Sequence, residues 1–488
     1  MLLKRFYDNN LAQASYLIGC AATGEAVVFD ANRDVEQYVR AANDEGLRIT
    51  HVTETHIHAD FVSGSRELAT RTGAKLLLSG EGGPDWQYAF AAEDGATLLH
   101  DGDDFMVGNV RFDVLHTPGH TPEHLTFLVT DTAATERPMG AVTGDFIFVG
   151  DVGRPDLLER AANVAGTMRA GARSLFRSLS RFKQLPDYLQ LWPGHGAGSA
   201  CGKALGAVPS STLGYERLAN WGLRIEDEEQ FTEAVLAGQP EPPKYFAEMK
   251  RINREGPRLL GGFHRPQRLD AAKLQELLAS DAIVVDTRSA AEYAERNVPG
   301  TINIPLNRSF NTWAGWLVPY DRDFHLIVGA SGTTCIDDAV RDLAMIGLDR
   351  VAGYFTAAVL DAWSSSGRET GTVPQLTVTD LAEAMRRSTA TVIDVRGRVE
   401  WEAGHLPGVT NIPVGYLAER IAEIPRDRPV VMQCQSGARA AIAASVLRAK
   451  GLSNVATLVG GFADWAQAGL PVAREEEPGG RSAWASTH

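Results

Sequence analysis

The chain has 488 residues, which at roughly 100–200 residues per domain predicts about three domains and makes a single packed core improbable. Apolar residues make up 44% and charged residues 22%, which argues against wholesale disorder. Its 61 acidic and 47 basic residues give a net charge of −14, which argues against nucleic acid and anionic membranes as partners and leaves small thiol metabolites open.

Short apolar strands separated by glycine-containing loops run through the first 250 residues. The expected strands are Ala26–Phe29, Ile49–Thr53, Lys75–Leu78, Val110–Leu115, Leu125–Val129 and Tyr188–Trp192. A helix over 66–72 is predicted to end at Gly73, a residue suited to a left-handed cap. The proline-rich stretch 238–243 and the polar region 251–266 predict a linker after this first domain.

Beyond the linker the sequence repeats itself. Asp286–Arg288 recurs as Asp394–Arg396, and Val298–Pro305 recurs as Leu406–Pro413, in both cases 108 positions later. A repeat of this length is a domain, so we expect two homologous α/β domains with parallel sheets. The predicted organisation is a domain over 1–250, a linker over 251–266, a middle repeat over 267–370, a C-terminal repeat over 375–475 and a flexible tail over 476–488.

The four cysteines are isolated from one another. Cys20, Cys201, Cys335 and Cys434 form no CxxC pair, which argues against a disulfide framework and against a zinc ribbon. No apolar run is long enough to span a bilayer, and the N-terminus lacks the apolar region of a signal peptide. We therefore expect a cytoplasmic protein with reduced thiols. A cysteine with a special role in such a protein would take part in chemistry and not in structural cross-linking.

Histidine and aspartate motifs follow several of the expected strands. The candidate metal ligands and their neighbours are His56, His58, Asp60, His120, Asp145 and His195. They occur in the order H-x-H-x-D, PGH, GD and PGH, each in a loop after an apolar strand, and loops at one sheet edge can share a site. Imidazole and carboxylate ligands suit iron, zinc or manganese.

This ordered set resembles the metallo-β-lactamase superfamily over about residues 1–245. The resemblance implies an αββα sandwich, so the fold class is α/β multidomain. In binuclear members, which include the glyoxalase II hydrolases, a further histidine after the first motif helps to hold a second zinc. Here that position is Phe61, which cannot ligate, and its presence favours one metal ion.

Persulfide dioxygenases of this superfamily use a single non-haem iron held by two histidines and one aspartate. The resemblance assigns these ligands to His56, His120 and Asp145, with one Fe(II) per subunit and zinc as the alternative metal. Those relatives usually keep the histidine that is absent here, so this chain is a variant. The resemblance makes the remaining residues, His58, Asp60 and His195, groups that orient the ligands or hold water.

Two residues near these motifs are candidates for contact with substrate. Arg154 lies in a segment similar to the G-R-x-D sequence whose arginine binds substrate in the family; the alternative is a surface arginine paired with Asp156. Cys201 follows the last histidine motif by six residues, and we expect the nearby Lys203 to lower its pKa. The alternative for Cys201 is an inert buried thiol.

Cys434 follows a predicted strand over 429–433 and precedes an alanine-rich helix. Backbone N–H groups at the start of that helix, with Arg439, would stabilise a thiolate or a persulfide. The C-x-S-G-x-R loop and the repeated motifs resemble a rhodanese domain, which makes Cys434 the nucleophile, and a loop of this length is linked to sulfur chemistry. In the middle repeat Gly329 aligns with Cys434, Thr334 aligns with Arg439, and Cys335 falls on the helix, so we expect a structural role for that repeat.

Together these resemblances imply a bifunctional sulfur-oxidising enzyme. Its first domain would use Fe(II) and O2 to oxidise the persulfide of a small thiol (glutathione, coenzyme A or cysteine) to sulfite, and Cys434 would transfer sulfur, which could yield thiosulfate. One alternative is a zinc thioester hydrolase of the glyoxalase II kind fused to a sulfurtransferase, and another is a non-enzymatic sulfur-binding or sensing protein. The sequence leaves open the thiol, the product and the subunit count, with a homo-oligomer among the options.

Overall fold

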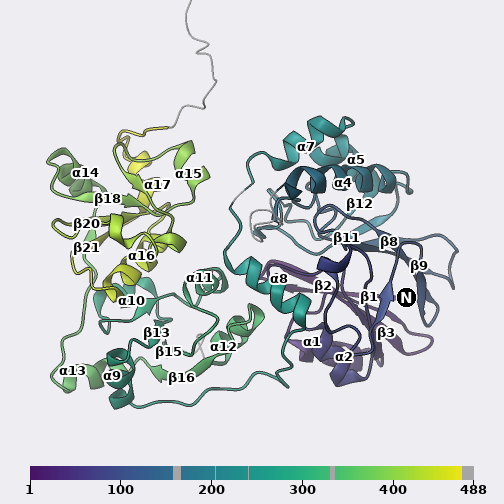
Figure 1. The fold of residues 1–488 in the computed structure, drawn as a ribbon, viewed down its shortest axis with the longest axis horizontal. Coiled ribbons are helices and arrows are strands. Elements are labelled where there is room, and N and C mark those ends of the chain that lie inside the picture. The colour runs from purple at the N-terminus through teal and green to yellow at the C-terminus, as the bar shows by residue number, and fades with distance from the viewer. Residues whose placement is uncertain (158–165, 204, 240, 330–335, 475–488) are drawn as a thin grey trace, which may run out of the picture. The chain divides into compact units, whose positions relative to one another are not determined.

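The computed structural model describes residues 1–157, 166–203, 205–239, 241–329 and 336–474. These residues divide into two compact units (Figure 1). The first unit contains residues 1–265 together with 308–316 and 337–349. The second unit contains the described residues among 266–307, 317–336 and 350–488. Two short segments of the middle repeat therefore belong to the first unit.

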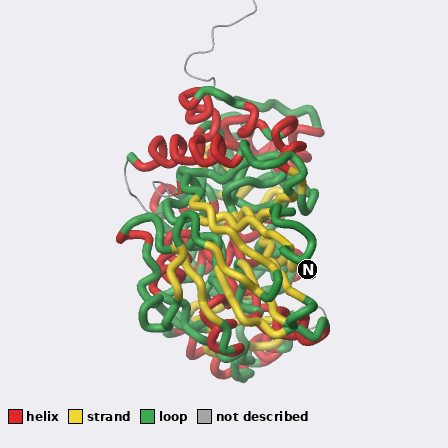
Figure 2. The backbone as a smooth tube through the Cα atoms, turned by 90° about the vertical axis from the view of Figure 1, so that its right-hand side faces the viewer, coloured by secondary structure: helices red, strands yellow, loops and turns green. Residues whose placement is uncertain are grey.

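Two six-stranded sheets form the centre of the first unit, and Figure 2 shows its strands running side by side. In spatial order the first sheet contains β1 (Leu2–Asp8), β2 (Gln13–Cys20), β3 (Glu25–Phe29), β4 (Arg48–Thr53), β5 (Lys75–Ser79) and β6 (Thr97–Leu99). The second contains β12 (Ser211–Thr212), β11 (Gln190–Pro193), β10 (Gly140–Gly144), β9 (Leu125–Asp131), β8 (Val110–His116) and β7 (Asp104–Val107). Phe29 of one sheet packs on Phe112 and Phe127 of the other, so the core lies between them.

Helices cover the outer faces of both sheets. The helices α1 (Val35–Asp44) and α2 (Ser65–Thr72) pack on the first sheet, and α4 (Thr167–Phe182) and α7 (Glu228–Leu236) pack on the second. The other helical segments built from residues 1–265 are η1 (Pro84–Trp86), α5 (Leu213–Ala219), α6 (Trp221–Arg224) and α8 (Tyr245–Glu255). The predicted αββα sandwich is confirmed, and α2 ends at Gly73 with a φ of 69°, as expected.

The middle repeat adds α11 (Phe310–Leu317) and α12 (Ile336–Met345) to this unit. The linker predicted over 251–266 begins inside a helix of the structure. Residues 251–255 are the end of α8, where Asn253 is buried, because this stretch supplies apolar and polar contacts to the first unit.

The second unit contains two parallel sheets, as predicted for the repeats. The sheet of the middle repeat has the order β14 (Ile302–Asn303), β13 (Ile283–Asp286), β15 (Phe324–Val328) and β16 (Val351–Thr356). The sheet of the C-terminal repeat has the order β17 (Gln375–Leu376), β21 (Val455–Leu458), β20 (Val430–Gln433), β18 (Thr391–Asp394) and β19 (Thr410–Asn411). The helical segments are α9 (Ala271–Ala279), α10 (Ala290–Glu295), α13 (Val359–Ser365), α14 (Val378–Arg386), α15 (Arg398–Ala403), η2 (Val414–Tyr416), η3 (Ile421–Glu423), α16 (Ala438–Ala449) and α17 (Gly461–Gln467).

The sequence repeat corresponds to a repeated buried ion pair. Arg288 pairs with Asp286 over 2.6 Å, and Arg396 pairs with Asp394 over 2.7 Å. In each repeat an asparagine amide then donates to the backbone carbonyls of these two residues. A buried carboxylate and guanidinium need such partners, so both copies keep the motif although the loops around it differ. Among the described residues no helix combines the length and the apolar character needed to cross a bilayer.

Candidate metal centre and sulfur-transfer site

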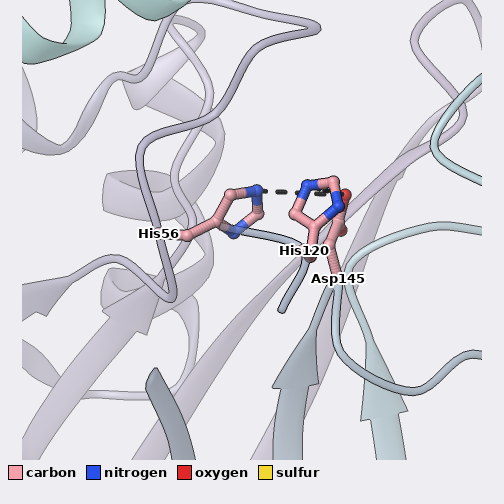
Figure 3. A group of neighbouring side chains, drawn as sticks. All are labelled: His56, His120 and Asp145. Carbon is pink, nitrogen blue, oxygen red and sulfur yellow. Dashed lines mark ion pairs between the residues drawn. The ribbon is translucent and has the colours of Figure 1, made fainter. Parts of the chain in front are cut away.

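Three loops at one edge of the sandwich bring His56, His120 and Asp145 together (Figure 3). They follow β4, β8 and β10 respectively. Their ligand atoms all lie within 4.8 Å of one another, and all three side chains are buried. Nε2 of His120 is 3.4 Å and Nε2 of His56 is 3.9 Å from Oδ2 of Asp145. The sequence predicted this group from motifs that lie up to 89 positions apart (56 and 145).

The surroundings of this group fit a divalent metal ion. Neither oxygen of the buried Asp145 carboxylate accepts a hydrogen bond from a described residue. Burying a carboxylate without partners costs free energy, and a bound cation would offset this cost. Nδ1 of His120 is 3.0 Å from the Arg154 carbonyl, and Nδ1 of His56 is 2.9 Å from the Thr55 hydroxyl, so both Nε2 atoms remain for a ligand. Burial lowers the pKa of both histidines, which keeps the imidazoles in the neutral form that binds metals.

A second group of three lies beside the first. Ligand atoms of Asp60, His195 and Cys201 are also within 4.8 Å of one another. Nε2 of His195 is 3.3 Å from Asp60 and 3.4 Å from Oδ1 of Asp145. Burial opposes a charge on His195, but the carboxylates of Asp145 and Asp60 outweigh it and raise the pKa of this histidine. The roles expected for Asp60 and His195 in orienting ligands or water remain predictions.

The expectation that Lys203 lowers the pKa of Cys201 is wrong. The amine of Lys203 donates to the Ala234 carbonyl and lies 5.0 Å from the centre of the Trp221 ring, and these contacts hold it. Burial has the largest effect on Cys201 and raises the pKa of its thiol well above the usual value. The negative charges of Asp145 and Asp60 act in the same direction. Cys201 is therefore a buried thiol beside the candidate metal centre, and a part for it in turnover remains a prediction.

His58 pairs with Asp30 and packs on His56, with the centres of the two histidine rings 4.2 Å apart. Its Nε2 is 3.2 Å from the Asp30 carboxylate, and this charge, with those of Glu54 and Asp60, overcomes the effect of burial and raises the pKa of His58 to about 9. The ring of Phe61 is buried with its centre 4.4 Å from that of His58. The position after Asp60 therefore contributes an apolar face.

Arg154 is completely buried and bound by other residues of the protein. Its guanidinium donates to both carboxylate oxygens of Asp156, at 2.8 and 2.7 Å, and to the Ala200 carbonyl at 3.0 Å. The pairing with Asp156 that the alternative expected is present, but this arginine is buried and not on the surface. Its backbone carbonyl also orients His120, as described above, whereas contact of its side chain with substrate remains a prediction.

Sequence reasoning missed two residues that position the ligands. Nε2 of His124 accepts a hydrogen bond of 3.1 Å from the backbone of Asp145, while its Nδ1 is 2.9 Å from the Thr117 hydroxyl. Asp30 accepts hydrogen bonds from the backbone and the hydroxyl of Thr55, at 2.7 and 3.0 Å. Two signals were present: the third histidine in the run 116–124, and an aspartate at the end of a predicted strand.

Cys434 lies at the end of β20 and before α16, as predicted. It is buried, and its sulfur accepts a hydrogen bond of 3.1 Å from the backbone of Gly437, whose φ of 97° directs the N–H inward. Arg439 donates to both oxygens of Glu400, at 2.6 and 2.8 Å. The loop therefore offers a donor to sulfur, and its arginine is held by a partner 39 positions earlier in the chain.

The C-terminal repeat also encloses the backbone of Cys434. The carbonyl of Cys434 accepts a hydrogen bond of 2.7 Å from the backbone of Phe462 at the start of α17. A Cβ atom on Gly461 would lie 2.2 Å from that carbonyl oxygen. Only glycine allows the two segments to approach this closely. Of the corresponding loop in the middle repeat, Gly329 is described, whereas Thr334 and Cys335 lie outside the described residues, as does the predicted tail.

Comparisons with known proteins agree with this architecture. The model of the metallo-beta-lactamase superfamily matches residues 9–195, and that of the rhodanese-like domain matches 270–362 and 377–468. A solved metallo-beta-lactamase from Staphylococcus aureus subsp. aureus COL is 45% identical, with a TM-score of 0.67, and the match covers 73% of this chain and 99% of that one.

The chain belongs to the metallo-beta-lactamase superfamily.

Two curated relatives each match less than half of this metallo-beta-lactamase chain. A hydroxyacylglutathione hydrolase from Methylobacterium nodulans is 32% identical over 157 residues, which are 32% of this chain and 52% of the relative. A mitochondrial persulfide dioxygenase, ETHE1, from Bos taurus is 26% identical over 200 residues, which are 40% of this chain and 68% of the relative. The chain is thus a metallo-beta-lactamase domain fused to two rhodanese-like domains, and the predicted fold class is confirmed.

Proposed function

We propose that the first domain oxidises the persulfide of a small thiol with O2, using a single Fe(II), and that the C-terminal repeat transfers sulfane sulfur. The observation that carries this proposal is the donor set of two histidines and one carboxylate, with Phe61 where binuclear relatives supply another ligand. Such a set leaves positions on Fe(II) open for substrate and O2. Similarity to a persulfide dioxygenase supports the same reaction.

The residues of the chain would hold and tune the ion. His56 and His120 would bind through Nε2, because their Nδ1 atoms already have partners. Asp145 would supply the negative charge that offsets the cation, and His124 would hold its backbone. Bound Fe(II) would supply the activation of O2. The overall reaction balances as one persulfide, one O2 and one water giving one thiol, one sulfite dianion and two protons.

The sulfur-transfer step would use Cys434. Its thiolate would attack the outer sulfur of thiosulfate, forming an S–S bond and releasing sulfite with the electron pair of the broken bond. In the reverse direction sulfite would attack the Cys434 persulfide and leave as thiosulfate, so sulfite from the first domain is a suitable acceptor. The hydrogen bond from Gly437 supports this role, because it stabilises negative charge on sulfur.

A second candidate function is zinc-dependent thioester hydrolysis. The group Asp60, His195 and Cys201 beside Asp145 favours it, since these residues would supply ligands for a second metal ion. The 32% identity to a hydroxyacylglutathione hydrolase points in the same direction. Metal-activated water would then attack the thioester, with no need for O2.

Metal content and O2 consumption of the full-length protein distinguish these functions. We expect one iron per chain, O2 uptake with glutathione, coenzyme A or cysteine persulfide, and sulfite as product. His120→Ala should lose both the metal and O2 uptake, whereas His100→Ala, a change at an exposed histidine, should keep both. Zinc-only protein that hydrolyses thioesters and consumes no O2 would refute the dioxygenase and favour the second candidate.

The sulfur-transfer step has its own test. Cys434→Ser should abolish transfer from thiosulfate to cyanide and leave O2 uptake unchanged. Cys20→Ser, which changes a buried cysteine of the first unit, serves as the control and should keep both activities. Transfer that survives in Cys434→Ser would contradict the assignment of the nucleophile.

A further inference from the structure

We infer that helix α12 of the middle repeat is a buttress of the metal centre on its Asp60–His195 side, and that Arg341 is the positioning residue of this buttress. The middle repeat lacks a cysteine at the position of Cys434, yet its segment 337–349 belongs to the first compact unit. The inference rests on the metal centre but not on the identity of the reaction there.

One connection runs from α12 to the loop that carries Asp60. The backbone carbonyl of Met345, at the end of α12, accepts a hydrogen bond of 2.7 Å from the backbone of Val62. From α8, the Asn253 amide donates to the carbonyls of His58 and Phe61 at 2.8 and 2.7 Å. The loop around Asp60 is therefore held between α8 and α12. Neither oxygen of Asp60 has a hydrogen-bond partner among the described residues, so apart from its ion pair with His195 its position depends on this backbone support.

A second connection runs from α12 to the turn between β1 and β2. Arg341 binds Asp8 over 2.7 Å and Asp34 over 3.2 Å. The next residue, Asp342, accepts a hydrogen bond of 2.8 Å from the Asn10 amide. Two adjacent residues of α12 thus anchor both sides of this turn, with a charge-assisted contact in each case.

That turn orients His195. The carbonyl of Ala12 is 2.9 Å from Nδ1 of His195 and also accepts the backbone N–H of Gly196. Ala12 has a φ of 52°, a left-handed conformation that is strained for alanine and persists only where the surroundings hold it. Loss of the anchors on Asp8 and Asn10 would let this strain relax and would release the ring of His195.

The position of α12 itself is fixed by a buried cation. Arg33 donates to the Ala344 carbonyl at 2.9 Å and pairs with Asp349 over 2.6 Å. A cation at the C-terminus of a helix is favourable, because the last carbonyls have no partner within the helix. Gly347 follows with a φ of 74°, and a Cβ atom there would lie 2.9 Å from Ile252 of α8. Helix α12 is therefore fixed independently of the contacts of Arg341.

Arg341→Ala in the full-length protein tests the buttress, with Arg265→Ala as the matched control. Arg265 pairs with Asp337 on the same helix, but that pair is exposed. We expect Arg341→Ala to speed exchange of the Val62 and Gly196 amides about tenfold and to change the visible absorption of the Co(II)-substituted protein. It should also lower the kcat of O2 uptake about tenfold, the usual scale for residues that orient ligands. Thiosulfate transfer through Cys434 should stay unchanged.

Two further variants keep the inference falsifiable if Arg341→Ala folds poorly. Arg341→Lys keeps the charge and should restore part of the Co(II) spectrum, and Asn10→Ala removes one hydrogen bond and should give a smaller change of the same kind. An unchanged Co(II) spectrum and unchanged amide exchange in Arg341→Ala would overturn the buttress. Absence of O2 uptake in the wild type would overturn the proposed reaction alone, because exchange and spectrum are measured without it.

Discussion

The backbone N–H of Asp145 donates a hydrogen bond to Nε2 of His124 across 3.1 Å. Burial lowers the pKa of His124 well below its usual value, so its imidazole is neutral and can accept this bond. The same ring stacks on His56, with the ring centres 5.1 Å apart. A residue that touches no ion in the proposed centre thus supports two of its three ligands.

We expect His124→Ala to weaken metal binding about 10- to 100-fold, because Asp145 loses its backbone support. The unpaired backbone group should also cost about 1–3 kcal/mol of stability. Titration of the apoprotein with Co(II) measures the affinity. His100→Ala is the control, and an affinity equal to that of the wild type in His124→Ala would contradict the positioning role.

Removal of the metal should lower the melting temperature of the first unit and leave that of the second unchanged. An ion present at about 100 times its dissociation constant stabilises the state that binds it by about 2.7 kcal/mol. Calorimetry with and without a chelator measures the shift. In His120→Ala the chelator should have no effect, since one of the three ligands is gone; a shift of wild-type size there would place the metal elsewhere.

Close approach at Cys434 should make Gly461→Ala far more damaging than Gly469→Ala. Both glycines have positive φ, 64° and 69°, which costs an alanine about 1–2 kcal/mol in each case. Only at Gly461 would the added Cβ collide with the Cys434 carbonyl, at 2.2 Å; nothing lies within 4 Å at Gly469. We expect a loss of sulfurtransferase kcat of about 100-fold for Gly461→Ala, as for other misplaced reacting groups. Equal rates in the two variants would contradict this account.

The carboxyl group of Asp342 should make stability depend on pH. Burial raises its pKa to about 6, although Arg341 opposes this, against about 3.9 in the unfolded chain. The folded protein therefore binds the extra proton, and stability falls as pH rises from about 4 to about 6. The melting temperature of Asp342→Asn relative to the wild type should increase over this range and stay constant above it.

Asp337→Asn provides the control for this pH dependence. The hydrogen bond from Arg265 lowers the pKa of the exposed Asp337, so its contribution has the opposite sign and is lost as pH falls. A melting-temperature difference for Asp342→Asn that does not vary with pH would show that folding does not raise the pKa of Asp342.

The grouping of His56, His120 and Asp145 could be predicted from the sequence, whereas the backbone contacts that support His195 and the Asp60 loop could not. His56 and Asp145 stand in loops directly after apolar strands, and strand order brings such loops to one edge. The support of His195 comes from the backbone carbonyl of Ala12, which carries no side-chain signal. That of the Asp60 loop comes from Met345, 285 positions later (345 and 60), through a main-chain hydrogen bond.

The direction of a long side chain was equally beyond sequence reasoning. Lys203 is two positions from Cys201, but rotamer choice and a contact with Trp221 turn its amine to another partner. The correspondence between Asp286 and Asp394 can be read from the sequence, because each aspartate pairs with an arginine two residues later. An ion pair within two residues can be read from the sequence, whereas the tertiary partner of the Lys203 amine cannot.

The assignment of residues 308–316 and 337–349 to the first unit means that the backbone passes from one unit to the other five times. A single proteolytic cut therefore cannot release an intact middle repeat, and a gene truncated at residue 265 would encode a first unit without α11 and α12. Selection on such a chain can preserve a duplicated module for its architecture long after its chemistry has gone.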